Sequence, residues 1–135
     1  MNNITDSTKT QLAAACILLS VADADEILED QELDTINGIL QDFFTLDEKE
    51  ASSLIGKAQS EWENSTGIFE FGNQLNEGFS NDDKIDFISC VFEVAFADGE
   101  LQYLEHHTIK KIANILNLHR EDIITAKAEV KNFLD

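Results

Sequence analysis

The chain has little basic charge, little sulfur and no proline. Its 135 residues include 9 lysines and arginines and 2 cysteines, against 27 aspartates and glutamates, for a formal net charge of −18. Nucleic-acid-binding proteins gather cations to displace the counterions of phosphates, and an anionic membrane surface would repel so acidic a chain. We therefore expect no nucleic-acid partner and no direct membrane insertion. Such acidity suits cations, basic protein partners or simple solubility.

Long hydrophobic runs are also missing. The longest, "LAAACILLSVA", is too short to span a bilayer and leads into carboxylates. The polar start "MNNITDSTKT" lacks the apolar region of a secretory leader. Hydrophobic residues make up 43% of the chain and charged ones 27%, which is a globular composition. We expect one domain over residues 1–135 and a cytoplasmic location.

The two cysteines, Cys16 and Cys90, lie inside apolar helical runs. Neither has a CxxC partner or an adjacent basic group that would lower its pKa. A disulfide framework usually needs more cysteines and an oxidising compartment. Both are therefore predicted to be reduced core residues, with redox chemistry as the alternative.

Apolar residues recur mainly with the 3.6-residue period of helices and seldom with the two-residue period of strands. This pattern predicts an all-α, compact bundle of about seven helices. The first is expected from Ser7 to Ala24, buried nearly all round, and the second from about Asp30. The expected caps are Asp47 with Glu50 for the third helix, Ser80 or Asn81 for the fifth, and Asn117 or His119 for the seventh. The expected apolar positions include Phe69, Leu75 and Phe79 in a short fourth helix and Ile123, Ile124, Ala126, Val130 and Phe133 in the seventh.

Two stretches of the chain resemble each other: "VADADEILEDQE" at 21–32 and "VAFADGELQYLE" at 94–105, which we call the acidic elbows. Asp25 and Asp98 are 73 residues apart (98 − 25), and so are Glu32 and Glu105 (105 − 32). One residue then drops out, so that "DEKE" at 47–50 matches "HRED" at 119–122. The repeat, about 12–55 and 85–130, predicts two helical hairpins related by a pseudo-two-fold axis within one domain.

Four carboxylates of the elbows fall on helical stripes that are otherwise apolar. Asp25 shares a face with Leu18 and Val21, and Asp98 would do so with Val91 and Val94 if the fifth helix reaches it, with Gly99 closing that helix. Glu32 and Glu105 are flanked by apolar residues four positions away on both sides. A buried carboxylate must be protonated, paired or bound to a cation. With one arginine in the chain and the lysines mostly far from the elbows, a hard divalent ion is one solution.

Other interpretations of the elbows stay open. The aspartates could hydrogen-bond nearby amides in turns, the glutamates could serve the helix dipole, or the acidic surface could dock a basic partner. An EF-hand is excluded, because Leu28 stands where that loop needs glycine and Asp34 where it needs glutamate.

Nothing in the sequence favours an enzyme. His106 and His107 are adjacent and so point to different helix faces, unlike the paired histidines of a zincin. There is no nucleophile elbow, no P-loop and no glycine-rich phosphate cradle, since the 6 glycines are scattered.

The elbows carry a family resemblance. "FADGELQYLE", and "DADEILEDQE" apart from Glu26 in place of glycine, resemble the repeated motif of the TerB family of tellurite-resistance proteins, over about Leu12 to Val130. The resemblance implies a seven-helix domain, a role in tellurite resistance and stress responses, and calcium-binding partner proteins at the membrane. It also implies a metal-associated site at Asp25, Glu32, Asp98 and Glu105. Glu26 and Glu100 are further candidate oxygen donors.

Together these observations predict a non-enzymatic protein that binds a divalent cation, Ca²⁺ or Mg²⁺ rather than Zn²⁺, through the paired acidic elbows. The alternative is an acidic interaction module that docks a basic or membrane-associated partner without metal. We also expect a protein partner, a role that a second copy of the chain in a homodimer could fill.

Overall fold

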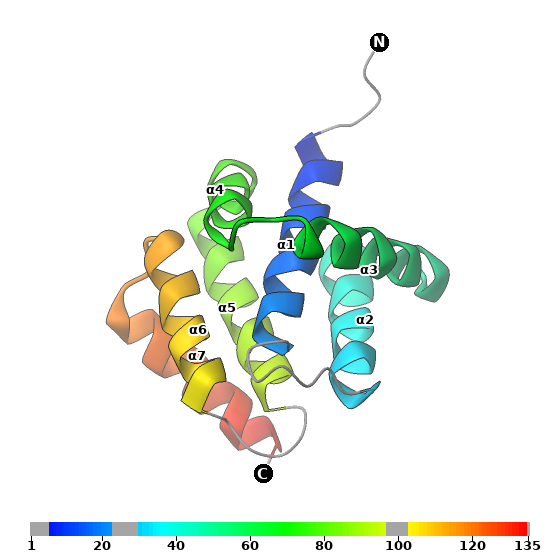
Figure 1. The fold of residues 1–135 in the computed structure, drawn as a ribbon. Helices are drawn as coiled ribbons and strands as arrows, with labels where there is room; N and C mark the ends of the chain where they lie inside the picture. Colours follow the sequence, from blue (N-terminus) through cyan, green and yellow to red (C-terminus); the bar gives the residue numbers. More distant parts are fainter. Residues whose placement is uncertain (1–5, 23–29, 97–102, 135) are drawn as a thin grey trace.

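The computed structural model describes residues 6–22, 30–96 and 103–134, and all regular elements in those ranges are α helices (Figure 1). They are α1 (Asp6–Ala22), α2 (Asp30–Phe44), α3 (Glu48–Glu63), α4 (Phe69–Gly78), α5 (Asn81–Ala95), α6 (Tyr103–Ile115) and α7 (Arg120–Leu134). The all-α prediction with seven helices is confirmed. In the part of the chain that the structure covers, no helix is long and apolar enough to cross a membrane.

Helix α1 is the centre of the core. It packs against α2, α3, α4, α5 and α6, and its residues 13–22 are all buried. Such a helix has no solvated face, which agrees with the continuous apolar run of its sequence. The prediction that it is buried nearly all round is confirmed over this stretch. Its expected last residue, Ala24, lies outside the described residues.

The other helices enclose α1. Helix α2 packs on α3 and α5, while α5 also packs on α6 and α7, and α4 on α6. Helices α4 and α6 come close together at Gly72, where a Cβ would collide with the Ile115 side chain. The Asn76 side-chain amide also donates a 2.8 Å hydrogen bond to the Ile115 carbonyl there. Glycine at position 72 thus sets how near these two helices come.

The helix caps follow the predicted local pattern. Asp47 accepts a 2.7 Å hydrogen bond from the Glu50 amide, and the Glu50 carboxylate accepts one of 3.0 Å from the Asp47 amide. Ser80 and Asp83 form the same reciprocal pair at the start of α5. Both are capping boxes, which satisfy amides that the helix leaves free.

The ends of α2 and α6 are built alike. Thr45 and Asn117 are the two non-glycine residues with positive φ in the described ranges (55° and 60°). After each, a leucine amide bonds back to the carbonyl five residues earlier, Leu46 to Gln41 and Leu118 to Ala113, both at 3.0 Å. This is the Schellman pattern of helix closure. Asn117 thus ends α6, and α7 begins after His119, whose amide bonds to the Asp122 carboxylate at 3.3 Å.

These closures lie at positions that the sequence repeat pairs, Leu46 with Leu118 and Asp47 with His119. They show that the two helix–turn–helix junctions share local geometry. The pseudo-two-fold axis that would relate the hairpins stays a prediction.

Three details of the predicted core differ from the structure. Phe69 and Ile124 are 65% and 56% exposed, because α4 buries Phe71 and Leu75, and α7 buries Ala126 and Val130. Phe69 and Ile124 lie two residues from those stripes, about 200° round the helix. Cys90 is half-buried rather than fully inside the core.

Candidate functional site

The helix ends that border the two acidic elbows lie at one end of the molecule. In Figure 1 the last turns of α1 and α5 and the first turns of α2 and α6 all lie at the lower end of the bundle. Helix α1 packs against α2, α5 and α6, which holds these ends near one another. The packing of the helices therefore brings the described helix ends that border both elbows to one side of the bundle.

Glu32 is the predicted site residue whose side chain the structure describes. It lies in the first turn of α2 and is 2% exposed, as its place on an apolar stripe predicted. It is the one buried carboxylate among the described residues, where the other buried polar side chains are Thr10 and Ser20. Glu32 also takes part in an interaction, so the residue has a partner.

The structure does not describe the side chains of the other predicted ligands. Asp25, Glu26, Asp98 and Glu100 lie outside the described residues, and Glu105 lies in α6 with its side chain outside them. Within the described ranges, no group of three or more histidine, cysteine, aspartate or glutamate side chains could hold a metal ion. The four-carboxylate cluster thus stays a prediction. Buried Glu32 is its one member whose side chain the structure describes.

One geometric premise of the prediction was wrong. Helix α5 ends at Ala95, with Phe96 as its C-cap, and does not continue to Asp98. The Phe96 amide still bonds to the Phe92 carbonyl at 2.9 Å, and Gly99, the predicted terminal glycine, lies outside the described residues. The placement of Asp98 with Val91 and Val94 required a longer α5, and Asp98 itself lies outside the described residues.

Sequence reasoning missed a groove between α2 and α5. It has a volume of about 520 Å³ and is lined by residues of both helices: Asp34, Thr35, Gly38, Ile39, Asp42, Phe43, Cys90 and Glu93. Asp34, Gly38 and Asp42 follow one another at four-residue spacing on α2, and Asp86, Cys90 and Glu93 share a face of α5. That spacing was visible in the sequence, but the pairing of the two faces was not.

Electrostatics in this groove are dominated by like charges. Partial burial and the charge of Asp42 raise the pKa of the Glu93 carboxyl above its usual value, although the side chain remains exposed. Burial, helped by Glu93, Asp86 and Asp42, raises the pKa of the Cys90 thiol from 9.0 to about 12. A thiol with this pKa is protonated at neutral pH and is a poor nucleophile. The groove is therefore unsuited to thiolate catalysis.

Cys16 is also a protonated thiol, and burial is again the largest cause. It is fully buried, and its sulfur donates a 3.6 Å hydrogen bond to the Ala58 carbonyl. Burial is the main cause that raises its pKa to about 12. Both cysteines are free, and Cys16 is a core residue as predicted.

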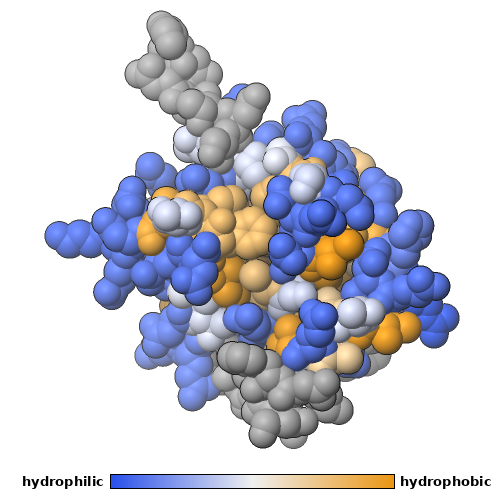
Figure 2. Space-filling view, turned by 180° about the vertical axis from the view of Figure 1, so that it is seen from behind, coloured by the Kyte–Doolittle hydropathy of each residue, from blue (hydrophilic) through white to orange (hydrophobic). Residues whose placement is uncertain are grey.

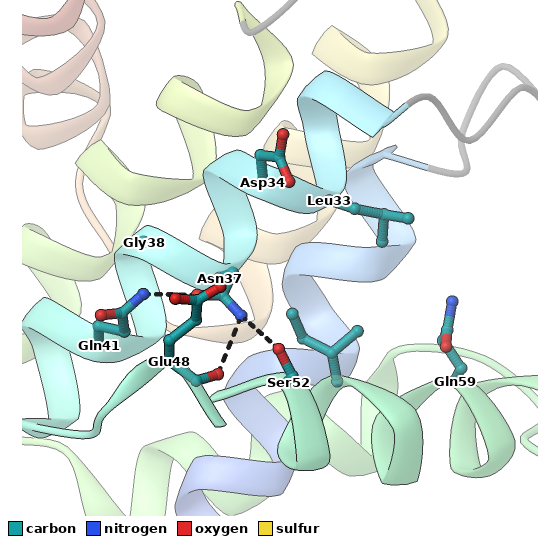
Figure 3. Close-up of a pocket in the computed structure, with 9 residues that line it drawn as sticks. Leu33, Asp34, Asn37, Gly38, Gln41, Glu48, Ser52 and Gln59 are labelled. Carbon is teal, nitrogen blue, oxygen red and sulfur yellow. Dashed lines mark hydrogen bonds between the residues drawn. The ribbon is translucent and has the colours of Figure 1, made fainter. Parts of the chain in front are cut away.

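A second groove, on the other side of α2, is lined by the carboxylates Asp34 and Glu48 together with amide and hydroxyl side chains. It has a volume of about 430 Å³ and lies between α2 and α3 (Figure 3). The Asn37 amide donates to Ser52 Oγ at 3.0 Å and to the Glu48 carbonyl at 3.5 Å, while Gln41 donates to Asn37 Oδ1 at 2.5 Å. These amide groups satisfy one another, so the network mainly fixes α2 against α3.

Comparison with known proteins identifies the family. The sequence model of the family described as "Tellurite resistance protein TerB" matches residues 11–128. Searches of curated proteins and of solved structures found no match. The family match spans most of the chain, including both acidic elbows, and the chain therefore belongs to the TerB family.

Proposed function

We propose that this TerB-family chain is a non-enzymatic protein that binds a divalent cation through Asp25, Glu32, Asp98 and Glu105. The family is associated with tellurite resistance, and the proposed role is in that or a related stress response. The observation that supports it best is Glu32, a 2% exposed carboxylate at the end of the bundle where the helices bordering both elbows come together.

The chemistry of a buried carboxylate supports a cation there. A carboxylate as buried as that of Glu32 has lost most of its hydration, and a cation close to it, in addition to its present partner, would stabilise its ionised form. Ca²⁺ and Mg²⁺ bind oxygen ligands, and carboxylates are the strongest of these. Glu26 and Glu100 would be further oxygen donors. Zn²⁺ is a weaker candidate because it prefers cysteine and histidine in structural sites.

Calorimetry and thermal denaturation with Ca²⁺, Mg²⁺, Mn²⁺ and Zn²⁺ test the proposal. We expect saturable heat and a rise of several degrees in Tm at ~1 mM of the preferred ion, because an ion that binds only the folded state stabilises it. Asp98→Asn and Glu105→Gln should each weaken binding about tenfold or more by removing a charged ligand. Glu129→Gln, on the exposed part of α7, is the matched control and should leave binding unchanged.

Two results would overturn the metal site. One is no stabilisation by any of the four ions. The other is equal weakening in Asp98→Asn and the Glu129→Gln control, which would mean that the ions only screen the net charge of −18.

Docking of a basic partner, in the cytoplasm or beside a membrane, is the second candidate function. The observation that favours it is the carboxylate-lined groove between α2 and α5, where no lysine or arginine is among the lining residues. This function does not need a metal.

A further inference from the structure

A second hollow shares Phe43 with the groove between α2 and α5. This second hollow has a volume of about 480 Å³ and is lined by Thr10, Phe43, Phe44, Glu77, Gly78, Phe79 and Asp83. Phe43 lines both. The two together, which we call the α2–α5 trough, run along α2 to the junction of α4 and α5.

The trough has a rigid aromatic ledge at its middle. The Phe43 ring is half-buried, and its centroid lies 5.0 Å from that of Phe44, 5.4 Å from Phe79 and 5.9 Å from Phe87. Phe79 and Phe87 are themselves in the core. Rings at these distances stabilise one another. An apolar side chain of a partner would therefore meet a fixed surface that costs little to order.

Carboxylates line the trough, and no cation does. Asp34, Asp42 and Glu93 line the first hollow, and Glu77 and Asp83 the second. Lysines line other hollows instead: Lys49 and Lys57 between α1 and α3, and Lys9 between α1 and α4. Where Asp42 faces Glu93, their repulsion is uncompensated by any lining cation and would be relieved by one from outside.

Apolar residues are also exposed on the surface of the molecule, next to hydrophilic ones. Figure 2 shows apolar atoms in patches, each bordered by hydrophilic side chains. An apolar centre with a charged rim is the usual composition of a protein-binding surface. The charge of the rim then selects the partner.

Resting on the second candidate function above and extending it, we propose that the α2–α5 trough docks a basic, amphipathic segment of a partner protein. One apolar side chain of the segment packs on Phe43, and its lysines or arginines pair with Asp34, Asp42 and Glu93. Nucleic acid and anionic membranes carry the wrong charge for this surface. A second copy of this chain would bring another −18 charges, so it is a poor occupant of this trough.

Titration of ¹⁵N-labelled protein with a synthetic peptide tests the proposal. The probe is a helical peptide of roughly 12 residues, which matches the length of α2 along the trough. It carries lysine and arginine on one face and leucine and phenylalanine at i, i+4 and i+7 on the other. We expect saturable shifts of amides in α2, the start of α5 and Cys90, with α3 and α7 little changed. EDTA is present throughout, so the result is independent of any metal at the elbows.

A charge-matched pair of variants tests the site. Asp42→Asn with Glu93→Gln removes two negative charges from the trough, whereas Glu61→Gln with Glu63→Gln removes two from the exposed side of α3. All four side chains are exposed, so both variants should fold. We expect the trough variant to weaken peptide binding about tenfold and the α3 variant less than about twofold.

Three results would overturn the proposal. Equal weakening by the two variants would show that the peptide senses only net charge. Equal binding of a lysine-only peptide without apolar residues would show that the Phe43 ledge is unused. Binding of anionic lipid vesicles with shifts in the trough would assign it to a membrane instead.

Discussion

Two grooves of similar volume differ in the charges that line them. The hollow between α1 and α3, of about 400 Å³, holds Lys49 and Lys57 beside Glu50. The groove between α2 and α5, of about 520 Å³, holds Asp34, Asp42 and Glu93 with no lysine or arginine. In the first, the carboxylate has cations of the same chain nearby. In the second, like charges face each other, and no lysine or arginine is among the lining residues.

The packing beneath the two sides differs as well. A Cβ on Gly72 would collide with Ile115, and one on Gly78 with Thr10, so α4 lies tightly on α6 and α1. Gly38, on the ridge of α2 beside the α2–α5 groove, has open space around it. The α4 side is thus closed by internal contacts, whereas α2 presents an open surface.

The largest effect is expected at Gly72. Gly72→Ala should destabilise the protein by about 1–2 kcal/mol, because overpacking against Ile115 outweighs the gain in helix propensity. Gly38→Ala is the control and should stabilise it by about 0.5–1 kcal/mol, since nothing opposes the gain. Urea denaturation followed by circular dichroism measures both. Equal changes in the free energy of unfolding of the two variants would show that α4 and α2 are not packed differently at these glycines.

A smaller loss of stability is expected when a carboxylate that caps a helix is removed. Glu50→Ala should cost about 1 kcal/mol, because the Glu50 side chain completes the capping box with Asp47 at the start of α3. Glu48→Ala, two residues earlier and exposed, lacks that reciprocal bond and is the control. The free energy of unfolding in urea distinguishes them. A loss at Glu48 as large as that at Glu50 would argue against the capping role.

Removing the charge of Glu93 should stabilise the protein, unlike the destabilising substitutions at Gly72 and Glu50. The pKa of Glu93 is raised in the folded state, so its ionisation costs stability as the pH rises through its ordinary pKa of 4.5 and above. Glu93→Gln should therefore stabilise the protein at neutral pH by about 0.5 kcal/mol, an effect that disappears in acid. Urea denaturation at pH 7 and at about pH 3 checks this. A destabilised variant at pH 7 would contradict the repulsion with Asp42.

The smallest change is expected in the reactivity of Cys90. Its pKa of about 12 keeps the thiol protonated at pH 8, and Glu93 and Asp42 contribute to that shift. Asp42→Asn with Glu93→Gln should lower the pKa and speed labelling by a disulfide reagent a fewfold. Cys16, fully buried, should stay unlabelled until the protein unfolds and thus serves as the internal reference. No change in the labelling rate would mean that burial alone sets the thiol pKa.

Much of the fold was predictable because helices and caps depend on near neighbours in the chain. The capping boxes at Asp47 and Ser80 join residues three apart, and the 3.6-residue period indicated seven helices. The burial of Glu32 followed from its apolar neighbours at four-residue spacing. The end of α5 did not follow, since the apolar pattern continues past Ala95 while the backbone turns at Phe96.

What the sequence determined by itself was the helical class, the local caps, the acidic motif and the strong negative charge. These are properties of short windows or of composition. The tertiary structure alone decided that Cys90 lies half-exposed, that Gly72 meets Ile115, and that Asp42 on α2 faces Glu93 on α5. The members of each such pair are tens of residues apart, so their approach depends on how whole helices pack around α1, which no local spacing encodes.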